Sequence, residues 1–190
     1  MKAQNTASDK NIHKAKISFE VLNDDGTFPN NKNLPLIIYK KAFILPAEDA
    51  ASVTEKILHE NSWENTWRNG VYGFHHYHST AHEVLVVYNG YAEILLGGDT
   101  GYKTKIKKGD VLIIPAGVAH KNIHSSNDFY VVGGYPVGQD WDMNYGKPSE
   151  RPAADRNIAR VPLPDMDPIY GLNGPILELW NKKNNKLNSE

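Results

Sequence analysis

Short apolar runs separated by turn residues dominate the chain between residues 17 and 135. Near the start, Ile17, Phe19 and Val21 alternate with polar residues, which is typical of a strand with one buried face. Further strands are predicted at 36–39, 71–77, 83–88, 92–96, 102–106, 111–114, 119–123 and 129–133. Many short strands at regular spacing indicate an all-β fold, either a sandwich or a small barrel.

Residues 47–61 differ from this pattern and predict the one convincing helix. Ala50, Val53, Ile57 and Leu58 lie on one face at helical spacing. The predicted fold is therefore a β-barrel that carries one helix near its amino-terminal end.

Two of the predicted strands, at 84–88 and 111–114, are apolar on both faces. An antiparallel strand with one face in water should alternate instead. Something must therefore cover the outer face of these strands, either the carboxyl-terminal segment or a second subunit.

The composition divides the single domain into four parts. Residues 1–16 are polar and without periodicity, and we expect a mobile lead-in before the barrel of residues 17–135. Residues 136–180 hold seven of the eleven prolines and also several aromatic residues, so this extension should pack on the barrel. Whether it closes a pocket or only covers the outside is left open. Residues 181–190 are rich in Asn and Lys and predict a flexible tail.

Charge and cysteine content exclude several classes of function. The formal net charge of the 190 residues is −1, which gives no electrostatic footprint for nucleic acid or an acidic membrane surface. The absence of cysteine excludes disulfides, thiolate metal sites and a cysteine nucleophile. No stretch has the length of a membrane span, and no signal peptide is evident, so a cytoplasmic location is expected.

Six of the eight histidines lie between residues 75 and 124. His76 and His78 are two positions apart, so on a strand both rings project from the same face. Such a pair is found in metal sites, but by itself it also fits two polar residues on a solvent-facing strand.

The residues around this pair are spaced as in two longer motifs. The first motif comprises Gly70, His76, His78, Glu83 and Gly90, and the second comprises Gly109, Pro115, Gly117 and His120. Together they resemble the two signature motifs of the cupin superfamily. This resemblance implies a jelly-roll barrel, or double-stranded β-helix, that binds one divalent metal ion through His76, His78, Glu83 and His120.

Further segments resemble the YjlB-like branch of bacterial cupins. They are the run 75–85 and the segments 24–26, 67–70, 136–142 and 167–171. The resemblance covers most of residues 17–180 and implies a fold and a metal site, but it does not imply a substrate. Because cupins commonly pair through a sheet, we also expect a homodimer.

The expected ligand set suits iron, manganese, nickel, cobalt or zinc, since it combines three imidazoles with one carboxylate and has no sulfur donor. A six-coordinate ion with four protein ligands would keep two positions for water or substrate. That arrangement is what a catalytic site needs.

Several neighbours of these ligands are candidates for further roles. His82 competes with Glu83 for the acidic position of the motif, but adjacent strand residues face opposite ways and the spacing to Gly90 favours Glu83. The catalytic candidates near the metal are His82, His124 and Tyr77, although strand alternation should point Tyr77 away and His124 also fits an exposed loop histidine.

Candidates for substrate binding are aromatic or basic. They are Trp67, Arg68 and Trp141, with Trp180 as a possible part of the same stacking surface. Tryptophans in such a chain more often pack under loops, and a lone basic residue is more often solvated.

Taken together, these patterns favour a metal-dependent enzyme that acts on a small polar metabolite. Oxygenation, isomerisation and decarboxylation all fit such a site. The alternatives are a non-enzymatic protein that binds or senses a metal or small ligand, and a storage or structural role.

Overall fold

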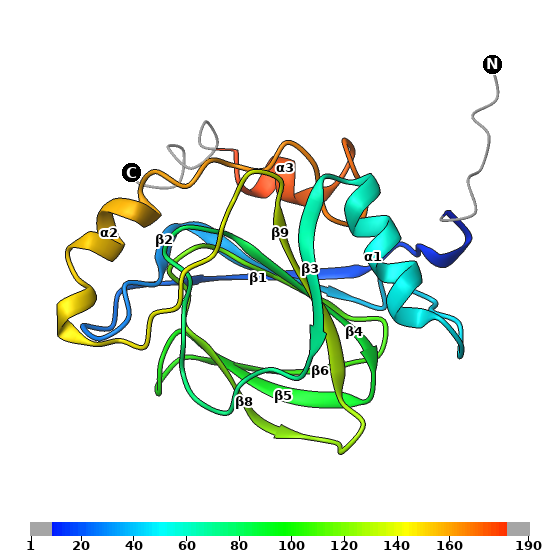
Figure 1. Cartoon of the computed structure of the whole chain (residues 1–190), viewed down its shortest axis with the longest axis horizontal. Coiled ribbons are helices and arrows are strands. Elements are labelled where there is room, and N and C mark those ends of the chain that lie inside the picture. Colours follow the sequence, from blue (N-terminus) through cyan, green and yellow to red (C-terminus); the bar gives the residue numbers. More distant parts are fainter. Residues whose placement is uncertain (1–8, 182–190) are drawn as a thin grey trace.

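Two antiparallel sheets that face each other make up most of the computed structural model, which describes residues 9–181 (Figure 1). The larger sheet has the strand order β1-β2-β7-β4-β9-β3, and the smaller has the order β6-β5-β8. The strands are β1 (Lys16–Leu22), β2 (Asn31–Lys40), β3 (Trp63–Asn69), β4 (Glu83–Asn89), β5 (Tyr91–Leu96), β6 (Tyr102–Lys107), β7 (Val111–Ile114), β8 (His120–Ser125) and β9 (Tyr130–Pro136). This arrangement confirms the predicted all-β fold.

Helices are few and short. The longest is α1 (Ala50–Glu60), within the predicted range of 47–61. The others are η1 (Asp9–Asn11), η2 (Pro148–Glu150), α2 (Ala153–Ile158) and α3 (Pro175–Leu179). No helix within residues 9–181 combines the length and the apolar character that crossing a membrane requires.

Strands β4 and β7 are apolar on both faces because each face packs into a different core. Leu85 and Leu112 point between the sheets, where they meet side chains of β5 and β6. Val86 and Val111 point to the other side of the large sheet, into a second core. Alternation along each strand thus supplies both cores.

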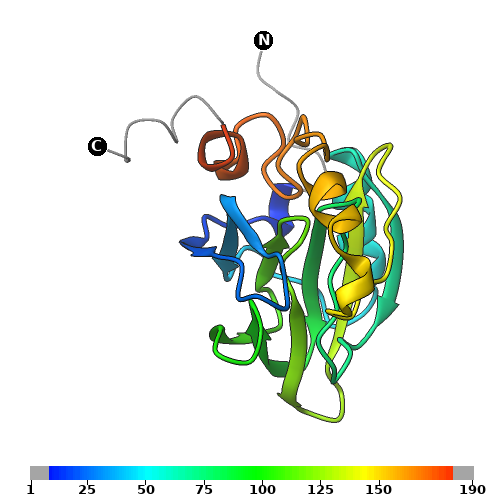
Figure 2. The same cartoon turned by 90° about the vertical axis from the view of Figure 1, so that its left-hand side faces the viewer.

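The second core is covered by α1 and by the carboxyl-terminal segment. Ile57 and Leu58 of α1 pack there together with Ile169, Ile176 and Trp180. Figures 1 and 2 show α1 and α3 on the side of the large sheet that faces away from β5, β6 and β8. The chain therefore covers its own apolar strands, and these strands no longer indicate a second subunit.

Asp167 fixes the carboxyl-terminal segment on the sheet. Its buried carboxylate accepts a hydrogen bond of 2.5 Å from the Tyr39 hydroxyl of β2, and others from the backbone N–H groups of Ile169, Tyr170 and Ile176. A buried carboxylate is stable only with such partners. The segment is thereby joined to β2, the strand next to the edge of the large sheet.

The amino-terminal segment is held by the same region. The Ala15 N–H donates to the Tyr170 hydroxyl, and that hydroxyl donates to the carbonyl of His13. The N–H of His13 also bonds the carbonyl of Ala42. Residues 12–15 are therefore paired, which differs from the mobile lead-in expected for 1–16; residues 1–8 and 182–190 lie outside the described part of the chain.

Three local predictions differ from the structure. The segment 71–77 is not a strand but a loop that makes isolated backbone bridges. Strand β3 was not predicted, because its sequence is polar and a bulge between Glu64 and Trp67 interrupts its pairing. The apolar face of β1 is exposed rather than half-buried, since β1 is the edge strand of the large sheet.

We predict that Trp180→Ala lowers the free energy of unfolding by about 3–5 kcal/mol. The indole is 1% exposed, packs in the second core and donates a hydrogen bond of 2.9 Å to the carbonyl of Pro35. The control is Leu172→Ala in the same segment, since Leu172 is 69% exposed. Urea unfolding measures both, and equal stability of the two variants would contradict this role of the carboxyl-terminal segment.

Candidate metal centre

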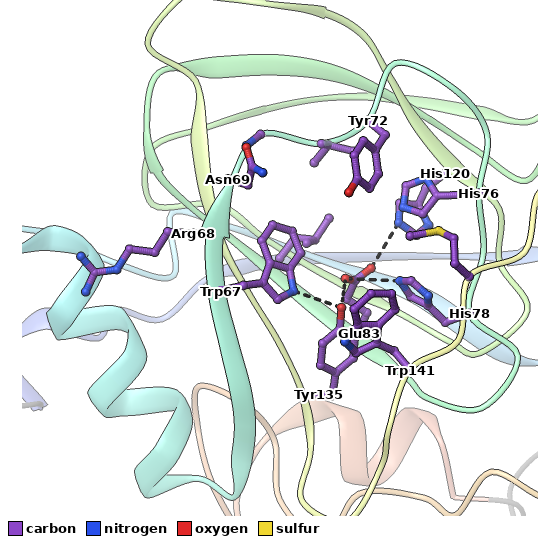
Figure 3. A pocket seen from close by; sticks show the side chains of 14 residues that line it. Trp67, Arg68, Asn69, Tyr72, His76, His78, Glu83, His120, Tyr135 and Trp141 are labelled. Carbon is purple, nitrogen blue, oxygen red and sulfur yellow. Dashed lines mark hydrogen bonds and ion pairs between the residues drawn. The ribbon is translucent and has the colours of Figure 1, made fainter.

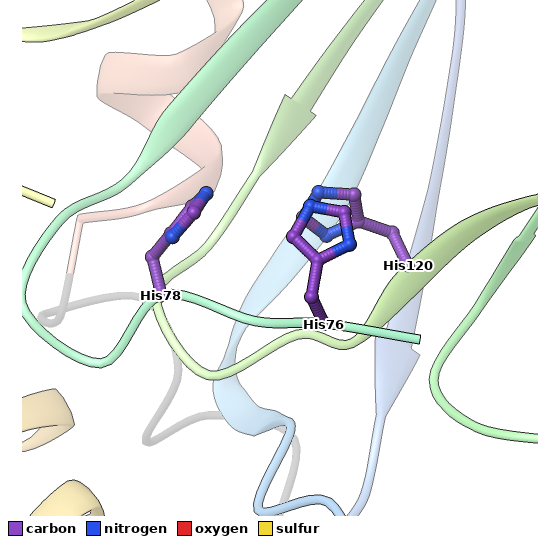
Figure 4. A group of neighbouring side chains, drawn as sticks. All are labelled: His76, His78 and His120. Carbon is purple, nitrogen blue, oxygen red and sulfur yellow. The ribbon is translucent and has the colours of Figure 1, made fainter. Parts of the chain in front are cut away.

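Three buried histidines converge at one end of the space between the sheets. The ring nitrogens that His76, His78 and His120 direct at one another all lie within 4.8 Å (Figure 4). A pair of backbone hydrogen bonds, 3.2 and 2.9 Å long, joins His76 to His120, the first residue of β8. This bridge gives the loop at His76 a strand-like conformation, so the rings of His76 and His78 face the same way although no strand is formed.

Glu83 completes the group from the opposite sheet. It is the first residue of β4, and its inward carboxylate lies 3.2 Å from Nε2 of His120 and 3.6 Å from Nε2 of His78 (Figure 3). The Tyr135 hydroxyl donates to its Oε1 over 3.1 Å, and the Trp67 indole N–H donates to that hydroxyl over 3.0 Å. Oε2 is buried and is the oxygen that lies 3.2 Å from Nε2 of His120, but it makes no hydrogen bond among residues 9–181.

Backbone carbonyls orient the three imidazoles. Nδ1 of His76 bonds the carbonyl of Phe74 over 3.3 Å, and Nδ1 of His120 bonds that of Val118 over 3.1 Å. Nδ1 of His78 bonds the carbonyl of Asp142. Because a carbonyl can only accept, each Nδ1 carries a proton, and in the neutral ring Nε2 then offers its lone pair to a metal ion.

The ionisation of the group favours a cation at its centre. Burial lowers the pKa of His76 to about 3, and the neighbouring His120 adds to this effect, so the His76 ring is neutral near pH 7. Burial acts against the charge of Glu83, but His78 and His120 outweigh it and lower the pKa of that carboxyl. Burial acts against a charge on His78, but the Glu83 carboxylate outweighs it and raises the pKa of that ring. A metal ion binds the neutral imidazole and the ionised carboxylate, so at His78 it would take the place of a proton.

These donors fit a divalent metal ion by their chemistry. Imidazole nitrogen with carboxylate oxygen suits iron, manganese, cobalt, nickel or zinc. A cation here would also give the buried Oε2 of Glu83 the partner that it lacks. The histidine group could therefore hold a metal.

A loop of the carboxyl-terminal extension holds His78 from the outside. The Asp142 carboxylate accepts hydrogen bonds from the N–H and hydroxyl of Ser79, both 2.5 Å, and from the side chain of Asn144 over 2.8 Å. Since the Asp142 carbonyl also bonds His78, one residue fixes both the ring and the turn that follows it.

A cavity of about 220 Å³ opens beside the histidines and Glu83. Trp67, Tyr135 and Trp141 form part of its wall (Figure 3). The Trp67 ring lies against the backbone of Gly133, its pairing partner on β9, where an added Cβ would come within 2.2 Å of the indole. Glycine is therefore needed at position 133 for Trp67 to form this wall.

The catalytic candidates proposed from the sequence do not line the cavity. His82 points to the opposite face of β4, where its Nδ1 accepts from the N–H of Ala116 and its ring contacts Trp180. Tyr77 is buried on the far side of the loop and donates to Glu150. His124 is exposed, because a bulge opposite Glu93 and Ile94 of β5 turns the end of β8 outward.

The candidates for substrate binding divide into two groups. Trp67 and Trp141 do line the cavity. Arg68 lies at its edge, but its guanidinium makes two 2.6 Å contacts with the carboxylate of Glu55 on α1. Trp180 lies in the second core and not at the cavity. The stacking surface is thus formed without Trp180.

Sequence reasoning missed two residues that support the site. Tyr135 was not singled out, although alternation from Gly133 along β9 places its side chain on the inner face of the sheet. Tyr72 is four positions before His76, so the predicted strand at 71–77 places both side chains on the same face, although the structure has a loop there. Alternation therefore indicates the direction of both residues.

Comparison with known proteins agrees with this architecture. The sequence model of the family described as Cupin matches residues 62–134, which include all four candidate ligands. A protein of Bacillus subtilis (strain 168), described as the uncharacterized protein YjlB, is 43% identical over 159 residues, covering 84% of this chain and 93% of that protein.

Solved structures resemble parts of the fold. A DUF861 family protein of Thermotoga maritima covers 47% of this chain and 92% of its own, with 21% identity and a TM-score of 0.33. An acireductone dioxygenase of Bacillus anthracis covers 68% of this chain and 83% of its own, with 13% identity and a TM-score of 0.41. The chain has two facing sheets, matches the Cupin model over residues 62–134 and is 43% identical to YjlB over most of its length. It therefore belongs to the cupin family, in the YjlB-like branch.

Proposed function

We propose that the protein is a metal-dependent enzyme that acts on a small metabolite. One divalent ion, of iron, manganese, nickel, cobalt or zinc, would be bound by His76, His78, Glu83 and His120. The reaction would be of the oxygenase, isomerase or decarboxylase type. The observation that carries the proposal is that these four side chains converge at the wall of a cavity instead of enclosing a sealed point.

Different residues of the chain would hold the ion, orient its ligands and line the cavity beside it. The three histidines and Glu83 hold it, and Tyr135 fixes the orientation of the Glu83 carboxylate through its 3.1 Å hydrogen bond. Trp67 and Trp141 line the cavity beside the ion. A bound divalent ion would supply Lewis acidity to an oxygen of the substrate.

The cavity also distinguishes this proposal from a structural ion. Structural sites are closed by their protein ligands, whereas catalytic sites leave a position open. Here the space of about 220 Å³ lies directly beside the ligands. The alternative is a non-enzymatic protein that senses a ligand in this cavity. Experiment must distinguish it from the proposed enzyme.

We expect one metal ion per chain and a loss of metal affinity of at least about tenfold in His120→Ala, because each ligand contributes directly to the binding free energy. Elemental analysis and metal titration measure both quantities. The control is His124→Ala, since His124 lies on the same strand but is exposed and outside the site. Unchanged metal content and affinity in His120→Ala would refute the assignment.

We expect catalysis to require the same ion. The protein of known metal content is incubated with a metabolite library, while oxygen consumption and isotopic exchange are followed. Turnover by the parent and by His124→Ala, with none by His120→Ala, supports an enzyme. Saturable ligand binding without conversion of any compound favours the non-enzymatic alternative.

The proposal includes a homodimer and a cytoplasmic location. Support for the dimer now comes from β1, an edge strand whose Ile17, Phe19 and Val21 are 41%, 54% and 49% exposed. We expect light scattering to give twice the chain mass of 21.3 kDa and Phe19→Lys to shift it toward the monomer. Leu172→Lys is the control, and a parent of 21.3 kDa at micromolar concentration would rule the dimer out.

A further inference from the structure

The wall of the cavity beyond the four candidate ligands is predominantly apolar and aromatic. Its apolar and aromatic side chains are Trp67, Val71, Tyr72, Leu85, Tyr135, Trp141 and Met143, and Asn69 and Arg68 are its polar members. They come from β3, the following loop, β4, β9 and the loop after β9. A substrate in this space would exchange water for hydrocarbon and aromatic rings along most of its surface.

No free cation lines this space within residues 9–181. Arg68 is the one basic side chain at its edge apart from the histidines. Its guanidinium is held by Glu55 at 2.6 Å and by Ser52 at 3.1 Å, and Figure 3 shows it turned away from the cavity. A phosphate group in the cavity would therefore lack the bidentate partner that such groups usually find.

Aromatic rings continue from the wall to the surface. Tyr72 stacks on Phe74 with centroids 4.9 Å apart, and Phe74 contacts Tyr145 at 6.0 Å. Across the site, Trp141 stacks on Tyr135 at 6.2 Å. Tyr72 and Trp141 are 50% and 48% exposed, and they lie on opposite sides of Glu83 in Figure 3. Half-exposed rings on both sides of a cavity provide a surface for a planar apolar group.

The size of the cavity limits the ligand. At about 220 Å³ it is smaller than the 300–1,000 Å³ that is usual for sites of drug-sized ligands. It has room for a single ring with a short polar substituent, but not for a nucleotide.

We propose that the substrate is a small molecule with an apolar, aromatic body that lies between Tyr72 and Trp141, with an oxygen-bearing group directed at the histidines and with no phosphate. This inference rests on the proposed metal site and specifies its substrate class. It differs from the polar metabolite expected from the sequence, and it rests on the apolar and aromatic side chains that the fold brings together around the cavity.

Three probes with one shared binding group test the substrate class. Glycolate, mandelate and 2-phosphoglycolate are titrated into the cobalt-loaded protein, and the visible absorption of the bound cobalt reports binding. Mandelate is glycolate with an added phenyl ring, and covering about 60 Å² of that ring corresponds to about a tenfold gain in affinity. We expect mandelate to bind at least tenfold more tightly than glycolate, and 2-phosphoglycolate no more tightly than glycolate.

A matched pair of variants locates the effect. Tyr72→Ser should lower the affinity for mandelate about fivefold or more and leave that for glycolate unchanged, because it removes only the aromatic contact. Tyr91→Ser is the control, since Tyr91 is 53% exposed on β5 and does not line the cavity. It should bind both probes as the parent does.

The outcomes separate this inference from the proposed function. If cobalt is bound but mandelate and glycolate bind equally, or 2-phosphoglycolate binds most tightly, the aromatic substrate class is wrong and the metal site stands. If Tyr72→Ser retains the full preference for mandelate, the placement of the ring is wrong. If the parent binds no cobalt, both proposals fall together.

Discussion

The buried charge of Glu83 is the constraint around which this end of the molecule is organised. Its side chain is 3% exposed, and an ionised carboxylate so far from water is stable only when hydrogen bonds or a neighbouring positive charge compensate it. Tyr135 gives it one hydrogen bond, and His78 and His120 lie within 3.6 Å. Strands β4, β8 and β9 must therefore keep their register for the carboxylate to be tolerated at all.

Because the histidine rings must face Glu83, the backbone contacts that orient these rings lie outside the group of the four candidate ligands. Each imidazole uses Nδ1 for a backbone carbonyl, so Nε2 alone faces Glu83. Asp142 belongs to the loop after β9, and through its carbonyl and carboxylate this loop fixes His78 and Ser79. The carboxyl-terminal extension thus does two things: its first residues reach the cavity, and its last residues cover the large sheet.

How far the sequence predicts this arrangement depends on whether a local rule or a tertiary contact decides each feature. Alternation separates Glu83 from His82, because the pairing of β4 with β7 is regular from Glu83 to Val86. The face of His124 could not be predicted, because a bulge against β5 leaves no signal in β8 itself. Apolar residues on both faces of β7 require a cover, but its identity depends on how α1 and residues 163–180 fold back, which no local pattern encodes.

The shape of the cavity depends on one residue that is not a candidate ligand, Gly133. The Trp67 indole can lie flat on β9 only because residue 133 has no side chain. A methyl group there would displace the ring and change the shape of the space without altering any candidate ligand. Within this scaffold, the range of molecules admitted could therefore diverge between related proteins while the chemistry of the histidine group stays the same.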